Sequence, residues 1–286
     1  MTGEMQVTVA SSWSAKAHNE DACGFRADGA WVVDGATALE AGPPIEGLPA
    51  AAWLSSVADD YLCSVDWDGA ELADVLARLV GHVAARARLA GLPYAGTCRS
   101  TGFPTAAISV VRQRGDLLDL CLLGDVPVVL APAGGRPSPT VFVDPQFTTT
   151  ERTILDAIRA DIDHGDDPAA AYGRARGTLL ERRRRRNTSR GSWILGDVPE
   201  ATRHAHCRTL RLTGGEDLLL LSDGFARLVE PFALVDGYGA LVDAVRRGAA
   251  EELVHRLRET EQADPECRRH PRFGVSDDAS VVHAVI

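Results

Sequence analysis

The sequence has little that would tie it to a metal–sulfur site, a disulfide scaffold or a membrane. Its six cysteines are scattered and none forms a C-x-x-C pair, so we expect neither a zinc framework nor a disulfide scaffold. No segment approaches the run of about 20 apolar residues that a membrane span needs. The first residues also lack a basic stretch followed by an apolar one. These absences predict a soluble, unprocessed protein of the reducing cytoplasm with no membrane partner.

Positive charge is also scarce. Lysine and arginine together number 30 against 40 aspartates and glutamates, which gives a formal net charge of -10. This balance argues against a general binder of nucleic acid or of anionic membranes. A hydrophobic content of 45% over 286 residues is enough to bury a substantial core. No internal repeat or low-complexity linker is visible, so we expect one domain over residues 1–286 that carries a variable insert at about 144–206.

Strand-like and helical patterns alternate in blocks along the chain. Short runs rich in small or β-branched residues predict strands, and apolar residues at helical spacing predict helices. The predicted strands cover residues 5–10, 22–27, 30–35, 103–113, 116–124, 126–132, 206–214, 217–224 and 277–286. The predicted helices cover residues 53–61, 72–83, 148–181 (with a break at "DHGDDP") and 237–262.

The order of these blocks bears on the fold class. The first three strand runs indicate a hairpin-rich sheet. The runs at 103–113, 116–124 and 126–132 are joined by tight turns, so we expect them to be consecutive antiparallel neighbours. Strands, then helices, then strands again favour an α+β layered sandwich over a doubly wound parallel sheet.

Acidic residues recur where hydrophobic strands begin or end. Asp34 closes "WVVDG", Asp125 follows "LLG", Asp223 closes "LLLLSD", and the pair Asp277 and Asp278 precedes the last strand. Each of them alone is typical of an ordinary turn. If the strand ends converge, however, the carboxylates would repel one another unless hard cations neutralised them. Oxygen ligands of this kind select magnesium or manganese.

Taken in order, these acidic segments resemble those of the metal-dependent serine/threonine phosphatases of the protein phosphatase 2C type, the PPM family of bacteria. The resemblance runs from about Lys16 to the C-terminus and implies the family's fold, a four-layer α-β-β-α sandwich of two mostly antiparallel sheets flanked by helices, with a helical flap insert. The matching segments are Glu20–Asp21, Asp34–Gly35, Pro104–Ala107, Gly124–Asp125, Ser222–Gly224 and Asp277–Ser280.

The resemblance also implies a set of metal ligands. Asp34 would bridge two Mn²⁺ or Mg²⁺ ions, and the Gly35 carbonyl would complete one of them. Asp223 and Asp277 would hold the other ion, and Asp125 with Asp223 would form the third site seen in many bacterial members. Two cations that share a water molecule would lower its pKa so that it gives hydroxide near neutral pH, and the hydroxide would attack phosphorus in line. No phosphoenzyme is therefore expected.

Residues near the first acidic segment would complete the site. By the same resemblance, Glu20 and Asp21 lie at or just outside the ligand shell and orient metal-bound water. Lys16 stands where the family usually has an arginine that grips the substrate phosphate, and a lysine offers a point charge without the planar fork. His18 could replace the histidine that follows the "DG" of many eukaryotic members. A solvated surface lysine and a structural histidine are the plainer interpretations of Lys16 and His18.

The segment "ERRRRRNTSRGSW" falls where the family carries its variable flap beside the active site. A run of five arginines, Arg182–Arg186, is typical of a solvated helix end, where cations are also favoured electrostatically. The alternative is that some of these arginines contact a phosphorylated substrate, because guanidinium groups suit phosphate recognition.

Four candidate functions differ in the residues that they need. The resemblance implies hydrolysis of phosphoserine and phosphothreonine in proteins, and the same chemistry on a small phosphorylated metabolite is the alternative. A catalytically weak phosphate-binding regulatory module is disfavoured because the acids are all present. A haloacid-dehalogenase-like phosphatase with Asp34 as nucleophile would need an aspartate two positions later, where this chain has Ala36.

Overall fold

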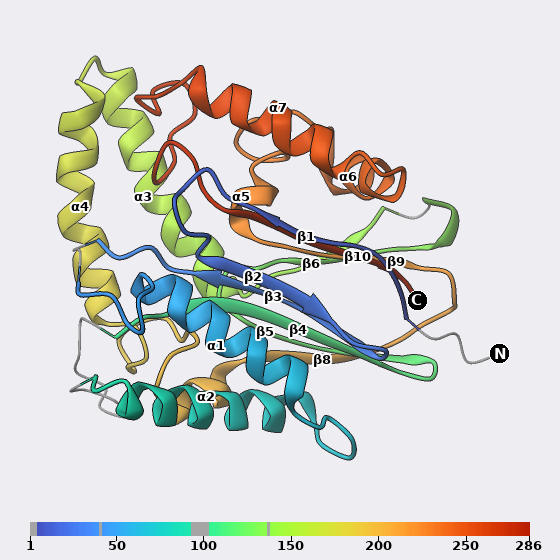
Figure 1. Ribbon diagram of the computed structural model, residues 1–286. Helices are drawn as coiled ribbons and strands as arrows, with labels where there is room; N and C mark the ends of the chain where they lie inside the picture. Colours follow the sequence, from blue (N-terminus) through green and yellow to red (C-terminus); the bar gives the residue numbers. More distant parts are fainter. Residues whose placement is uncertain (1–4, 40–41, 93–102, 136–137) are drawn as a thin grey trace.

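Two antiparallel sheets lie face to face, with helices on the outer face of each (Figure 1). The computed structural model describes residues 5–39, 42–92, 103–135 and 138–286. The first sheet runs in the order β1 (Gln6–Trp13), β10 (Ala279–Val285), β9 (Asp217–Leu221), β6 (Val128–Ala131) and β7 (Thr140–Phe142). The second runs in the order β2 (Asp21–Phe25), β3 (Gly29–Gly35), β4 (Ala106–Arg114), β5 (Leu117–Leu123) and β8 (His206–Arg211). The expected α+β sandwich is confirmed.

The helices divide between the two outer faces and one end of the sandwich (Figure 1). Those over the second sheet are α1 (Ala50–Ser64) and α2 (Leu72–Leu89). Those over the first sheet are α6 (Gly237–Arg246) and α7 (Ala250–Gln262). The short helical elements are η1 (Ala133–Gly135), η2 (Pro199–His204) and α5 (Asp223–Ala226). No helix in the described parts of the chain is both long and apolar enough to cross a membrane.

Apolar layers lie between the sheets and under the helices. In β3, Val32 faces the other sheet while Trp31 and Val33 pack beneath α1 and α2. Successive side chains of a strand point to opposite faces, so a strand that is covered on both sides has to be apolar throughout. This is why "AWVV" shows no polar alternation before it reaches Asp34.

The predicted insert forms a pair of helices, α3 (Pro145–Asp163) and α4 (Pro168–Arg184), at one end of the sandwich (Figure 1). Each begins with an aspartate whose side chain accepts a hydrogen bond from the first turn, followed at once by a proline. The pair has a small apolar core of its own, in which Ile154, Ile158 and Ile162 pack against Ala171. The two helices of the insert are therefore held together by apolar contacts of their own.

The expectation about strand partners is only partly correct. β4 and β5 are antiparallel neighbours as expected, but β6 crosses to the other sheet and pairs with β7 and β9. Among the first three strands, β2 and β3 form a hairpin, whereas β1 lies in the opposite sheet beside β10. An apolar pattern indicates that a strand is buried, but it does not indicate which strand lies beside it.

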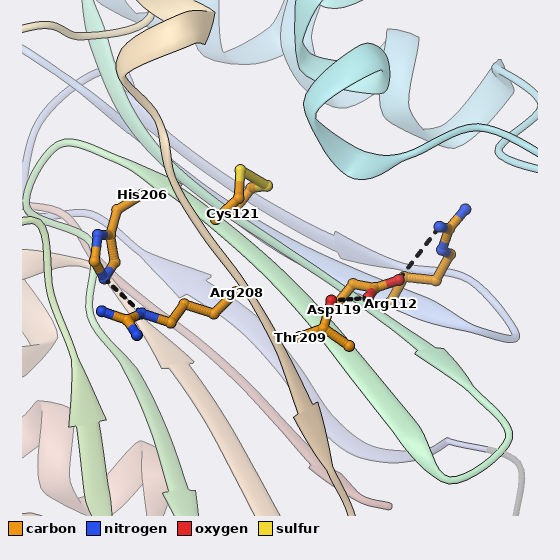
Figure 2. The surroundings of a disulfide bond; sticks show 7 residues. Arg112, Asp119, Cys121, His206, Arg208 and Thr209 are labelled. Carbon is orange, nitrogen blue, oxygen red and sulfur yellow. Dashed lines mark hydrogen bonds and ion pairs between the residues drawn. A yellow bond between two sulfur atoms is a disulfide. The ribbon is translucent and has the colours of Figure 1, made fainter.

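A disulfide corrects a second expectation. Cys121 of β5 and Cys207 of β8 lie directly opposite each other on neighbouring strands, with Cα atoms 4.1 Å apart, and their sulfurs are bonded (Figure 2). The two residues are 86 positions apart, so only the pairing of β5 with β8 brings them together.

Candidate metal centre

Acidic side chains from both sheets meet at one end of the sandwich. In the β2–β3 hairpin Asp21 lies opposite Asp34, and Asp34 ends its strand next to Ala107 of β4. From the other sheet, the chain leaves β9 and places Asp223 so that its backbone N–H donates to Asp34 Oδ2 at 3.2 Å. The predicted convergence of strand ends is thus found for these three aspartates.

Two glycines allow the backbone segments to approach this closely. A Cβ at Gly35 would lie 2.4 Å from the Glu20 carbonyl oxygen, and a Cβ at Gly224 would lie 1.9 Å from that of Asp278. Both distances are far below van der Waals contact, so any side chain would push the acidic segments apart. The glycines of the "DG" and "SDG" sequences are therefore required by the close approach of the backbone segments.

The carboxylates are close enough to disturb one another's ionisation. Burial raises the pKa of Asp34 well above its usual value, and the charges of Asp223, Asp21, Asp125 and Asp277 raise it further. Burial, followed by the charge of Asp277, raises the pKa of Asp223 to about 7. A group of acids that resists ionisation in this way is one that bound cations would stabilise.

Asp21 and Asp125 belong to the same cluster. Burial raises the pKa of Asp21 well above its ordinary value, against hydrogen bonds that include one from the Ser280 hydroxyl at 2.8 Å. Burial also raises the pKa of Asp125, and the nearby charge of Arg186 opposes this rise.

Lys16, the only lysine in the chain, lies within the cluster. Its ammonium is 2.9 Å from Glu20 Oε2, 3.1 Å from Asp277 Oδ1 and 3.2 Å from Asp278 Oδ2. Burial opposes its charge, but the same three acids outweigh that effect and raise the pKa of Lys16 above its usual value. The interpretation of Lys16 as a solvated surface residue therefore does not describe its environment.

Arg227 is a second cation of the cluster and was not predicted from the sequence. Its guanidinium is 2.8 Å from Asp277 Oδ2 and 3.2 Å from Glu261 Oε1, and its side chain is only 7% exposed. The residue follows Asp223 by one helical turn, and that spacing beside the "SDG" segment is the signal that could have identified it.

His18, by contrast, is exposed in the bend before β2. Among the described residues its ring makes no hydrogen bond or ion pair with these acids.

The donor set fits a hard cation. It offers several crowded carboxylates and the Gly35 carbonyl, and Asp278 Oδ1 is buried without a hydrogen-bond partner. In the described part of the chain, no three His, Cys, Asp or Glu side chains are arranged to ligate one ion directly. Lys16 and Arg227 between them hold both oxygens of Asp277. Magnesium characteristically binds through one or two carboxylates and keeps several waters. The site therefore suits an ion of this kind better than an ion that takes all its ligands from side chains.

A cavity of about 760 Å³ opens from this cluster toward the insert. Asp34, Asp125, Asp223 and Asp277 line one end of it. Side chains of α3 and α4 line the other end, and these include several arginines.

The arginine run is divided between this cavity and solvent. Arg182, Arg183 and Arg186 are half-buried and line the cavity, whereas Arg184 and Arg185 are exposed. The interpretation of the run as a solvated helix end therefore holds for Arg184 and Arg185 and not for the three arginines that line the cavity.

Comparison with known proteins places the fold. No protein-family model matches the sequence, and a search of curated proteins finds no match. Among solved structures, the Mycobacterium tuberculosis serine/threonine phosphatase PstP/Ppp superposes with a TM-score of 0.57 at 18% identity and covers 99% of both chains. PppA of Pseudomonas aeruginosa gives a TM-score of 0.53 at 16% identity, again with 99% of both chains covered.

A third solved structure, the PPM Ser-Thr phosphatase MsPP of Mycobacterium smegmatis, gives a TM-score of 0.51 at 17% identity, with 98% of this chain and 99% of that one covered. At such identities the likeness concerns the fold. This chain has the fold of the protein phosphatase 2C-type, or PPM, serine/threonine phosphatases.

Proposed function

We propose that this protein is a metal-dependent phosphatase that removes phosphate from phosphoserine and phosphothreonine residues of proteins. The observation that carries the proposal is the meeting of Asp34, Asp223 and Asp277 at one end of the sandwich. The fold supports it, because solved structures of that fold are described as serine/threonine phosphatases. One of them, PstP, was solved with two manganese ions, at a TM-score of 0.55, 17% identity and coverage of 99% of this chain and 98% of that one.

In the proposed site, Asp34, Asp223, Asp277 and the Gly35 carbonyl hold two Mn²⁺ or Mg²⁺ ions, and Asp125 with Asp223 provides for a third. Bound divalent ions lower the pKa of water and neutralise charge on phosphoryl oxygens. The chain's own contribution is to hold these oxygens close together at the junction of the two sheets.

Other residues orient the reactants. Asp21, held by the Ser280 hydroxyl, and Glu20, held by Lys16, position water beside the ligand shell. Lys16 supplies positive charge to the substrate phosphate. The exposed His18 is the alternative to metal-bound water as the proton donor to the leaving group.

We treat residues 1–286 as one domain with residues 144–206 as its inserted flap. β5 precedes the insert and β8 follows it, and the two are paired in one sheet and joined by the disulfide. The same sandwich is thus continuous on both sides of the insert.

Hydrolysis of a small phosphorylated metabolite is a second candidate function. The cavity volume of about 760 Å³ favours it, because sites for small molecules typically measure roughly 300–1,000 Å³.

The first experiment is hydrolysis of p-nitrophenyl phosphate with manganese, with magnesium and with a chelator, on the wild type and on Asp223→Asn. We expect activity only with metal, and a loss of at least 100-fold in the variant. The exposed Asp68→Asn is the matched control and should behave as the wild type does. Activity that survives both chelation and Asp223→Asn would contradict the proposal. An inactive protein that still binds inorganic phosphate would indicate the regulatory module instead.

The second experiment compares substrates. A panel of phosphoserine and phosphothreonine peptides is assayed beside phosphorylated sugars and nucleotides. A higher kcat/KM on peptides supports protein phosphatase activity, and a preference for one metabolite class supports the second candidate.

A further inference from the structure

The cavity beside the carboxylate cluster carries opposite charges at its two ends. The cluster end is acidic, and bound cations would neutralise the negative charge of its carboxylates. At the insert end, five arginines of α3, α4 and the turn after α4 line the wall: Arg152, Arg159, Arg182, Arg183 and Arg186. Among the residues whose side chains the structure describes, two acids, Asp156 and Glu230, line that part of the cavity with them. An excess of guanidinium groups next to a phosphatase site suits a substrate with negative charge beyond the scissile phosphate.

The direction of the α4 arginines is set by the position of the helix. Arg183 donates a hydrogen bond to the Thr37 carbonyl, three residues after Asp34. Arg186 donates to Thr105 Oγ1 at 2.9 Å, and Arg176 donates to the Leu39 carbonyl at 2.8 Å. These contacts fasten one side of the helix to the loops around the cluster.

The other end of α4 is fastened as well. The Tyr172 hydroxyl donates to the Cys267 carbonyl at 3.2 Å and accepts from the Arg272 backbone N–H at 3.0 Å. With both ends of α4 held, Arg182 stays at the cavity wall, and a donor fixed in this way binds an anion with less loss of side-chain entropy than a free surface arginine does. Arg152 and Arg159 of α3 also line the cavity but are exposed, and the Arg152 guanidinium lies 3.8 Å from Glu230 Oε2.

We propose that Arg152, Arg159 and Arg182, here called the insert arginine face, bind acidic side chains that flank the phosphorylated residue of a protein substrate. This inference rests on the proposed phosphatase function and names its substrate class, a phosphorylated segment rich in Asp and Glu. Arg183 and Arg186 anchor the end of α4 that carries Arg182.

The length of the face favours a peptide over a compact metabolite. Arg152 and Arg159 are seven residues apart on α3, which corresponds to about 10 Å along a helix axis. An extended peptide advances by about 3.3 Å per residue, so the face spans roughly three residues of bound chain. Several flanking acidic side chains could pair with it in one pose, whereas a small phosphate ester would reach only part of it.

The test uses two phosphopeptides of the same sequence that differ only in their flanking residues, Asp and Glu in one and Asn and Gln in the other. Each is assayed with manganese on the wild type, on Arg159→Gln/Arg182→Gln, and on Arg184→Gln/Arg190→Gln. The last variant removes the same charge from exposed positions of the same region. Thermal unfolding checks that both variants are folded.

We expect the wild type to prefer the acidic peptide by about tenfold in kcat/KM, chiefly through KM, because a few partly exposed ion pairs together contribute about that much. Arg159→Gln/Arg182→Gln should reduce the ratio to near one, and Arg184→Gln/Arg190→Gln should keep it. The preference should also weaken between 50 and 300 mM salt as charges are screened, roughly as Debye lengths shorten.

Equal rates on both peptides in the wild type, or an equal loss of preference in both variants, would overturn the inference while leaving the phosphatase function intact. Hydrolysis of a polyanionic metabolite in preference to both peptides would also overturn it. Failure to hydrolyse any substrate, p-nitrophenyl phosphate included, would instead refute the proposed function.

Discussion

The backbone N–H of Asp223 donates to Asp34 Oδ2 at 3.2 Å, although the two residues are 189 positions apart. Asp34 ends a strand of one sheet, and Asp223 follows a strand of the other. Face-to-face packing of the sheets therefore creates the acidic pocket, since neither sheet contains enough carboxylates alone.

Asp34→Asn should abolish metal-dependent hydrolysis and yet stabilise the metal-free protein. The asparagine can still accept the hydrogen bond from Asp223, but it removes one charge from a cluster that burial and repulsion already disfavour. We expect the free energy of unfolding without metal to rise by about 1–2 kcal/mol. Urea unfolding in chelator measures this, with Asp68→Asn as the control. A less stable Asp34→Asn protein would show that the acids do not repel one another as described.

Lys16→Gln should tighten metal binding and weaken substrate binding. The ammonium neutralises Glu20, Asp277 and Asp278, so its removal leaves more negative charge for a cation. We expect the Kd for manganese, measured by calorimetry without substrate, to fall about tenfold, or about 1.4 kcal/mol. The KM for p-nitrophenyl phosphate should rise in the same variant.

The control for Lys16 is Lys16→Arg, which keeps the charge and adds a planar fork. Its Kd for manganese should match that of the wild type, and its KM should be equal or lower. If Lys16→Gln binds manganese no more tightly than Lys16→Arg does, the ammonium does not compete with the metal.

Asp119 makes the second sheet sensitive to acid. Its carboxylate accepts hydrogen bonds from Arg114 at 2.8 Å, from Thr209 at 2.8 Å and from Arg112 at 3.3 Å; the last two residues are drawn in Figure 2. Burial opposes its charge, but the hydrogen bonds from these partners outweigh burial and hold the pKa of Asp119 below its usual value.

Asp119→Asn should therefore destabilise the protein at pH 7 by about 3 kcal/mol, because the buried Arg112 loses its counter-ion. A folded-state pKa below the unfolded one gives stability that is complete above about pH 4 and is lost as the pH falls through the folded value. The difference between wild type and variant should thus shrink below about pH 4. Urea titrations at pH 7, 5, 4 and 3 measure it, and a constant difference would contradict the assignment.

The Cys121–Cys207 disulfide should contribute measurably to stability. It closes a loop of 86 residues, so the double variant Cys121→Ser/Cys207→Ser should lose about 2–4 kcal/mol of unfolding free energy. Reductant should lower the stability of the wild type and leave the variant unchanged. Peptide mapping without reduction should recover the linked pair, and recovery of both cysteines as free thiols would contradict the pairing.

Local features of the site were predictable from particular residues. "AWVV" and "DLLLL" are apolar on both faces, and the acids and glycines that follow them mark strand ends where the chain has to turn tightly. The helices of the insert were recognisable from their apolar spacing and from the "DHGDDP" break between them, whereas the aspartate–proline pair that begins α3 at Pro145 was not used. Each of these signals concerns neighbours within a few residues, and short-range sterics and hydrogen bonding are enough to produce it.

By itself, the sequence determined the long strands and helices, their apolar faces, and which acids stand at strand ends, because these depend on local periodicity and turn chemistry. Only the tertiary structure decided that β6 changes sheets, that Cys121 meets Cys207, that Arg227 reaches Asp277, and that Arg182 faces the cavity while Arg184 faces solvent. Those outcomes depend on which distant segments pack together, and that choice is made by burial summed over the whole molecule.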